Sequence, residues 1–242
     1  MCGRYVLTAS PEEVRALFGY LDEVWFPARY NIAPTQPIAV VRLAGGRRQC
    51  SMMRWGLVPA WVEDPSSFKL LLNARAENIS NRPAFRDAIR YRRCLVPASG
   101  FYEWRRGPGK ARQPFWLRPR AGSLVAFAGL YETWTGAGGE SIDSACIITV
   151  PANRETAVIH DRMPAVIQPA DFDLWLSEGE LPTATLDSLL RSPPDDTFEV
   201  VPVSTRVNSA ANDGPDLIEP QAPGAADAGG LFAATARRAG SA

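Results

Sequence analysis

The second residue of the chain, Cys2, is the group whose chemistry stands out first. If Met1 is removed, Cys2 carries a thiol and a free α-amine on adjacent carbons, a 1,2-aminothiol that no interior cysteine can present. An α-amine ordinarily has a pKa of about 7.7 to 8 and a thiol about 8.5, so both are partly nucleophilic near neutral pH. The alternative is a frayed chain start without chemistry.

Glu103 is a carboxylate among aromatic residues, in the run Phe101-Tyr102-Glu103-Trp104. If the rings pack around it, desolvation raises its pKa toward the range that suits general acid and base catalysis. The alternation of a strand can instead point Glu103 into solvent. Both readings are open from the residues alone.

His160 is the only histidine, so any imidazole proton transfer must use it, although a lone loop histidine is commonly a polar surface group. Asn73 and Arg75 lie two residues apart on a predicted extended segment, which places both side chains on one face. An amide that orients a reactant beside a guanidinium that holds phosphate is one use of this pair. A hydrogen-bonded strand end is the other.

A 1,2-aminothiol condenses with an aldehyde, first to an imine and then, when the thiol closes on the imine carbon, to a thiazolidine ring. The natural macromolecular aldehyde with adjacent phosphates is the ring-opened sugar of an abasic site in DNA. Residues 1 to 120 carry 20 Lys and Arg against 9 Asp and Glu, although the whole chain has zero net charge. Of its 26 basic residues 24 are Arg, which can grip phosphate bidentately. The basic, arginine-rich half of the chain therefore favours an anionic partner such as nucleic acid.

Composition excludes several other classes of function. The four cysteines, at positions 2, 50, 94 and 146, form no CxxC pair, so neither a metal cluster nor a disulfide framework is predicted, and no cofactor is expected. Cys50, Cys94 and Cys146 are interpreted as small core residues. No apolar run has the roughly 18 residues of a membrane helix, and no signal pattern opens the chain. We expect an intracellular, cytoplasmic protein, nucleoid-associated if bacterial, that is monomeric and has no membrane partner.

The predicted elements are short. The capping box Ser10-Pro11-Glu12-Glu13 predicts a helix over 11–18 that ends near Gly19, and a glycine turn joins a hairpin over 38–53. Residues 29–37 are expected to be a structured loop, 54–61 an ordered surface segment, and 83–93 a helix whose arginines, Arg93 included, form a solvated face. Further strands are expected at 5–7, 94–97, 101–105, 115–117, 124–130, 145–150 and 198–203, and further helices at 153–158, 171–176 and 183–190.

Strands outnumber helices without a βαβ rhythm, which predicts a single α+β domain with a largely antiparallel, strand-rich core and short flanking helices. We place this domain at residues 2–220. The alanine- and glycine-rich segment 221–242 is predicted to be a disordered tail.

Six motifs together resemble the SRAP family of SOS-response-associated peptidase, or abasic-site processing, proteins. They are MCGRY at 1–5, RYNIAPT at 29–35, RWGLVP at 54–59, NARAE at 73–77, GFYEW at 100–104 and IHDRMP at 159–164. The resemblance implies binding of single-stranded DNA and a stable thiazolidine crosslink to abasic sites. It also implies autopeptidase (hydrolase) and lyase-type activities, although only Met1 precedes Cys2 and no self-cleavage need be invoked.

The resemblance also implies roles for individual residues. Cys2 would be the nucleophile, Asn73 would orient the opened sugar, Glu103 would act as acid and base, and His160 would assist proton transfer. The DNA contacts it implies are Arg4, Arg75 and Arg162 to phosphates, Thr149 through its backbone, and Pro34 and Trp61 against bases, with Arg82 as a further DNA-binding residue. The family often has a second aromatic after the position of Trp61, where this chain has Val62.

Two other functions compete with this one. Class II glutamine amidotransferases also begin Met-Cys-Gly and use an N-terminal cysteine with its own α-amine as base. Their fourth residue is typically apolar, whereas this chain has Arg4, and the other five motifs do not fit. The third possibility is a non-covalent single-stranded DNA-binding module in which Cys2 is idle.

Overall fold

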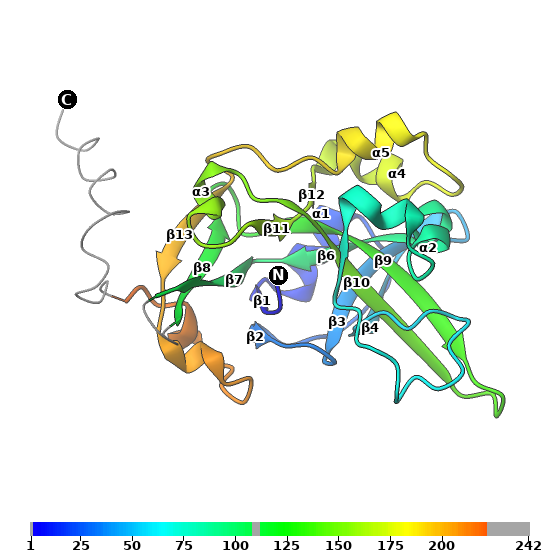
Figure 1. Cartoon of the computed structure of the whole chain (residues 1–242), viewed down its shortest axis with the longest axis horizontal. Coiled ribbons are helices and arrows are strands. Elements are labelled where there is room, and N and C mark those ends of the chain that lie inside the picture. Colours follow the sequence, from blue (N-terminus) through cyan, green and yellow to red (C-terminus); the bar gives the residue numbers. More distant parts are fainter. Residues whose placement is uncertain (1, 108–111, 222–242) are drawn as a thin grey trace.

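The computed structural model describes residues 2–107 and 112–221. A closed ring of five strands forms its centre, because β9 pairs with both β6 and β10 while β10–β4, β4–β3 and β3–β6 complete the circle (Figure 1). Every pair in the ring is antiparallel except β10–β4. The ring strands are β3 (Pro37–Ala44), β4 (Arg47–Trp55), β6 (Arg93–Ala98), β9 (Val125–Thr135) and β10 (Ser141–Pro151).

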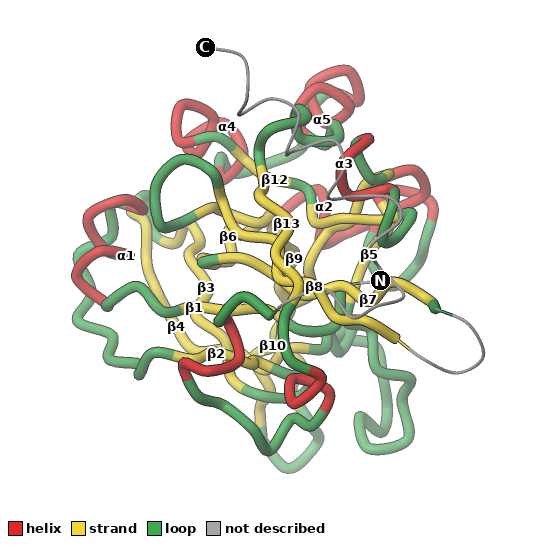
Figure 2. The backbone as a smooth tube through the Cα atoms, turned by 90° about the vertical axis from the view of Figure 1, so that its left-hand side faces the viewer, coloured by secondary structure: helices red, strands yellow, loops and turns green. Residues whose placement is uncertain are grey.

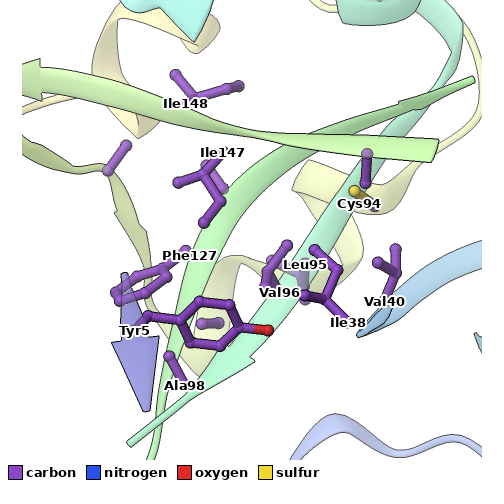
Figure 3. Packing of buried hydrophobic residues seen from close by; sticks show 14 of the residues in the cluster. Tyr5, Ile38, Val40, Cys94, Leu95, Val96, Ala98, Phe127, Ile147 and Ile148 are labelled. Atoms are coloured by element: carbon purple, nitrogen blue, oxygen red, sulfur yellow. The ribbon is translucent and has the colours of Figure 1, made fainter. Parts of the chain in front are cut away.

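Three short strands extend this barrel at its edges. β5 (Asn73–Arg75) runs parallel to β10, β11 (Arg162–Pro164) pairs antiparallel with β10, and β12 (Val166–Ile167) pairs with β9. The main apolar core fills the ring and the space beside it, and Figure 3 shows Ile38, Val96 and Phe127 from three ring strands packed with Tyr5. Cys50, Cys94 and Cys146 are buried in this core, which confirms their interpretation.

A second, fully antiparallel sheet packs against the barrel. Its order is β13 (Phe198–Pro202), β8 (Arg112–Pro119), β7 (Gly100–Arg106), β1 (Tyr5–Leu7) and β2 (Arg29–Ile32). Side chains alternate between its faces, as strand geometry requires. Tyr5 and Phe101 belong to the core shared with the barrel, whereas Val6 and Tyr102 pack on the opposite face with Leu217 of the C-terminal segment.

The two sheets are joined at Ser99 and Gly100, where the chain leaves β6 of the barrel and enters β7. Gly100 has φ +141°, and a Cβ there would lie 2.5 Å from both the Leu117 carbonyl oxygen and the Trp116 indole nitrogen. Only glycine fits this sharp change of direction. The Ser99 side chain accepts a hydrogen bond from the Thr8 backbone at 3.1 Å, which ties β1 to the junction.

The helices are short and lie around the strands (Figure 2). The helix α1 (Pro11–Phe18) confirms the predicted capping box and ends at Gly19 in the left-handed conformation. The others are α2 (Arg86–Tyr91), α3 (Arg154–Ala157), α4 (Phe172–Leu176), α5 (Thr183–Leu189) and the 3-10 turns η1 (Ala76–Asn81), η2 (Pro169–Asp171), η3 (Thr205–Asn208) and η4 (Pro215–Ile218). The predicted α+β, strand-rich fold is confirmed. Residues 108–111 and 222–242, and with them nearly all of the predicted tail, lie outside the described part.

Three local predictions are wrong. Residues 29–32 form strand β2 rather than loop, and the helix expected over 83–93 is limited to α2. Arg93 lies in β6 with 3% exposure, and its guanidinium donates hydrogen bonds to five backbone carbonyls, so it is not part of a solvated face. The segment 54–61 begins inside β4, and Trp55 is wholly buried.

Within the described residues, no helix is long and apolar enough to cross a membrane.

Candidate functional site

Cys2 lies just before β1 and is completely buried, not frayed. Its thiol faces the Arg4 carbonyl oxygen at 3.8 Å. Burial raises the pKa of the Cys2 thiol well above its ordinary value, and the nearby Glu103 carboxylate raises it further. At neutral pH the thiol is therefore protonated and needs a base before it can attack.

Asn73 reaches Cys2 from the other sheet. It opens β5, which is held beside β10 with Asn73 opposite Ile147. Its Nδ2 donates a hydrogen bond to the Cys2 carbonyl oxygen at 2.9 Å. The Oδ1 atom of Asn73 is buried and has no hydrogen-bond partner in the described part of the chain, so the amide fixes the backbone of Cys2 and leaves an acceptor beside it.

Glu103 lies in β7, the neighbour of β1. Tyr5 is opposite Phe101 in this antiparallel pair, so counting two residues outward places Gly3 beside Glu103. Glu103 shares the core-facing side of the strand with Phe101 and is 2% exposed, which rules out the solvent-facing reading. Burial raises the pKa of Glu103 to about 7, with a smaller contribution from the Asp161 carboxylate. The carboxyl can therefore give or take a proton near neutral pH.

His160 follows α3 and is half-buried. Its Nδ1 accepts a hydrogen bond from the Arg162 backbone N–H at 3.0 Å and lies 3.0 Å from the Asp161 carboxylate. Burial lowers the pKa of His160, so the ring is neutral near pH 7 despite Asp161. Because Nδ1 is then the acceptor, Nε2 carries the ring proton.

Arg162 is 8% exposed, and its side chain binds other groups of the protein. Its guanidinium forms a two-pronged ion pair with Glu77 and donates to the Thr149 carbonyl oxygen at 2.5 Å. Thr149 is itself fully buried in β10, opposite Arg75 of β5 and Pro164 of β11. A phosphate role for Arg162 stays a prediction, and it requires the phosphate to displace or join Glu77.

Arg4 is also engaged internally. Its guanidinium donates to Asn31 Oδ1 at 2.9 Å, to the Val207 carbonyl oxygen at 2.8 Å and to the Asn208 carbonyl oxygen at 3.2 Å. The fully buried Asn31 donates in turn to the carbonyl oxygens of Val207, Ser209 and Asn212. The structure thus gives Arg4 a role as a clamp on the C-terminal segment, next to the phosphate role that stays a prediction.

The remaining predicted DNA contacts lie outside the Cys2 cluster. Arg75 and Arg82 are exposed, at the end of β5 and after η1, and Pro34 lies half-buried in the turn between β2 and β3. Trp61 is 60% exposed in the long loop between β4 and β5. The structure brings together Cys2, Asn73 and Glu103. The carboxylate of Asp161, which follows His160, contributes to raising the pKa of Glu103.

Sequence reasoning missed Asn31, Glu77 and Asp213. The Asp213 carboxylate accepts from the backbone N–H groups of Tyr30 and Asn31 and forms an ion pair with Arg29. Asn31 and Glu77 both lie inside the motifs RYNIAPT and NARAE, which was the available signal.

Over residues 2–107 and 112–221, no group of three or more His, Cys, Asp or Glu side chains could hold a metal ion.

This arrangement defines an α+β protein in which Cys2 lies between the side-chain amide of Asn73 and the buried carboxyl of Glu103, whose pKa is about 7. The chain belongs to the SRAP family, since the family model for SOS response associated peptidase matches residues 1–210.

Individual relatives agree with this assignment. The chain is 36% identical over 222 residues to abasic site processing protein YoqW of Bacillus subtilis, covering 90% of this chain and 99% of that protein. It is 29% identical over 263 residues to abasic site processing protein HMCES of Xenopus tropicalis, covering 90% and 78%. A solved structure from Bacteroides thetaiotaomicron has the same fold, with a TM-score of 0.81, 24% identity and coverage of 91% and 100%.

Proposed function

We propose that this chain recognises abasic sites in single-stranded DNA and bonds to them through Cys2 as a thiazolidine. The observation that carries the proposal is the position of Cys2 between Asn73 of the barrel sheet and Glu103 of the second sheet. There, Asn73 holds the Cys2 backbone at 2.9 Å while Glu103, buried with a pKa of about 7, lies close enough to raise the pKa of the thiol. The relatives named abasic site processing proteins support the choice of lesion.

The reaction loses one water in total. After Met1 is removed, the Cys2 amine attacks the C1′ aldehyde of the opened sugar and forms a carbinolamine. Its hydroxyl leaves as water when protonated, and the nitrogen loses its proton to give the imine. The thiol sulfur then bonds to the imine carbon, and the thiol proton passes to the nitrogen to close the ring.

Glu103 suits both proton transfers. In its acid form it protonates the departing hydroxyl, and the carboxylate that results takes the proton of the buried thiol. The raised pKa of the thiol makes this base necessary. His160, neutral with a proton on Nε2, supplies a second donor at the imine stage.

Asn73 would position both partners. Its Nδ2 already fixes the Cys2 carbonyl, and its buried Oδ1 is available to accept a hydrogen bond from the sugar or from the freed amine. A near-attack geometry held in this way accelerates an addition by removing rotational freedom from the reactants.

The test uses protein whose loss of Met1 is verified by intact mass, incubated with a single-stranded oligonucleotide that carries one abasic site. We expect a heat-stable adduct with the mass of protein plus oligonucleotide minus one water. Cys2→Ser keeps the amine but lacks the thiol, so its adduct should survive only after borohydride reduction of the imine.

An equally heat-stable adduct from Cys2→Ser without reduction would refute thiazolidine formation. Glutamine hydrolysis without any adduct would favour the amidotransferase alternative, and salt-sensitive binding alone would favour the non-covalent module.

A further inference from the structure

The long β4–β5 loop and the β9–β10 hairpin extend from the same end of the barrel (Figure 1). Residues of both line a cavity of about 520 Å³ that does not include Cys2. Most of its wall is apolar, with Phe68 and Trp134 as the aromatic members. Arg54, Lys69 and Asp64 also line it. Neither Arg54 nor Lys69 forms an ion pair with any residue that the structure describes. The cavity thus combines aromatic surface with one carboxylate and with two cations that form no ion pair among the described residues.

The wall is held in shape by its own small core. Val58, Val62 and Trp134 form an apolar cluster separate from the main core, with Phe68 and Ile142 packed against it. The Trp134 indole N–H donates to the Val62 carbonyl oxygen at 2.6 Å. A cavity anchored by these contacts is preformed, which lowers the entropy that a ligand loses on binding.

Trp61 lies next to the cavity wall, against Phe68. Its ring meets the Phe68 ring edge to face with centroids 5.7 Å apart, and Trp61 is 60% exposed. Val62, which replaces the second aromatic often found in the family, is buried and points into the small core instead. Trp61 therefore places one exposed aromatic ring beside the cavity.

The cavity also lies close to Asn73 along the chain. Leu70 lines the cavity and precedes Asn73 by three residues, so their Cα atoms are at most about 11 Å apart. A stacked nucleic acid strand rises ~3.4 Å per nucleotide, so the cavity is within about five nucleotides of a lesion bound at Cys2.

We propose that this cavity binds a nucleobase of the damaged strand, on one side of the lesion, with Phe68 and Trp134 against the base and Arg54 and Lys69 on the neighbouring phosphate. The inference rests on the proposed function, because the lesion at Cys2 fixes the strand. Aromatic surfaces accept any base, which suits a protein that must find lesions in every sequence context. The Asp64 carboxylate repels phosphate from its own side and leaves the two cations as the phosphate contacts.

The test is a series of oligonucleotides with one abasic site and thymidine flanks of zero to eight nucleotides, extended on the 5′ side or on the 3′ side only. Affinity is measured by fluorescence anisotropy with Cys2→Ser, and adduct yield with the wild type. We expect one side to show a step of about tenfold in Kd once the flank reaches the cavity, within about five nucleotides.

Arg54→Ala and Phe68→Leu should remove the step. Arg47→Ala is the matched control for Arg54→Ala, since both arginines lie on β4, near its opposite ends and about 23 Å apart, and each loss removes one positive charge. Arg54→Ala should also reduce the salt slope of the long-flank complex by about one relative to the short-flank complex, whereas Arg47→Ala should leave that difference unchanged.

Equal affinity for all flank lengths on both sides, or the same loss from Arg47→Ala as from Arg54→Ala, would overturn the base-binding cavity while wild-type adducts still form. Absence of an adduct with every oligonucleotide would instead refute the proposed function. The two failures are therefore distinguishable.

Discussion

The burial of Glu103 can be tested through the unfolding free energy, because a buried carboxyl affects the stability of the fold as well as the proposed chemistry. Replacing it by Gln keeps the size and one polar oxygen but removes the ionisation. A carboxyl whose pKa rises from 4.5 in the unfolded chain to about 7 in the folded chain binds its proton more tightly when folded. The wild-type protein is therefore stabilised by this group at low pH and loses that stabilisation as the pH rises through 4.5 to 7.

The size of the effect follows from the two pKa values. Each pKa unit corresponds to 1.36 kcal/mol, so the interval from 4.5 to about 7 amounts to about 3 kcal/mol. At 2% exposure, solvent screening does not reduce this value appreciably. Glu103→Gln cannot ionise, so its unfolding free energy relative to the wild type should increase by about 3 kcal/mol between pH 4 and pH 8.

Urea denaturation followed by tryptophan fluorescence at both pH values measures this difference, with both proteins in the same N-terminal processing state. Glu77→Gln is the control, because the hydrogen bonds from Arg162 lower the pKa of the Glu77 carboxyl, so its substitution should destabilise the protein more at pH 8 than at pH 4. A pH-independent difference for Glu103→Gln would show that the carboxyl has an ordinary pKa, and the acid–base role would lose its basis.

Three further substitutions or titrations test the structure. Asn73→Ala should slow adduct formation at least tenfold in a timed gel assay while leaving affinity for undamaged single strands unchanged; parallel loss of both would make Asn73 a general structural residue. Arg93→Ala should lower the unfolding free energy by about 3 kcal/mol or more in urea, because several buried carbonyls lose their donor, and a change under 1 kcal/mol would contradict this. The NMR titration midpoint of His160 should lie below 6.5, and a midpoint above it would mean that Asp161 outweighs burial.

Local signals predicted much of the fold. The capping box and the glycine turn specify α1 and the β3–β4 hairpin through neighbouring residues, so both were predictable. Strand β2 was not, because its polar backbone is paired by β1 and by the side chain of Asp213, more than 180 residues away. The helix over 83–93 failed for a similar reason, since the carbonyls that hold Arg93 include those of Trp175, Ser177 and Gly179.

The site shows the same division. Glu103 and Phe101 are two residues apart on one strand, so their side chains lie on the same face. Because the Phe101 side chain faces the core, the Glu103 carboxylate is buried as well. No pattern in the sequence places Asn73 on Cys2, because that contact depends on the pairing of β5 with β10. The sequence also did not predict which groups of the protein bind Arg4 and Arg162. At these two positions it predicts only a positive charge.

The clamp between Arg4 and the carbonyl oxygen of Val207 joins residues 203 positions apart. During synthesis Arg4 leaves the ribosome 203 residues before Val207. Strand β7 and Asn73 lie between them in the sequence, so β1 can pair with β7, and Cys2 can meet Asn73, before the clamp can form. The clamp therefore closes over the segment that carries Cys2 after the other neighbours of that segment have already been made.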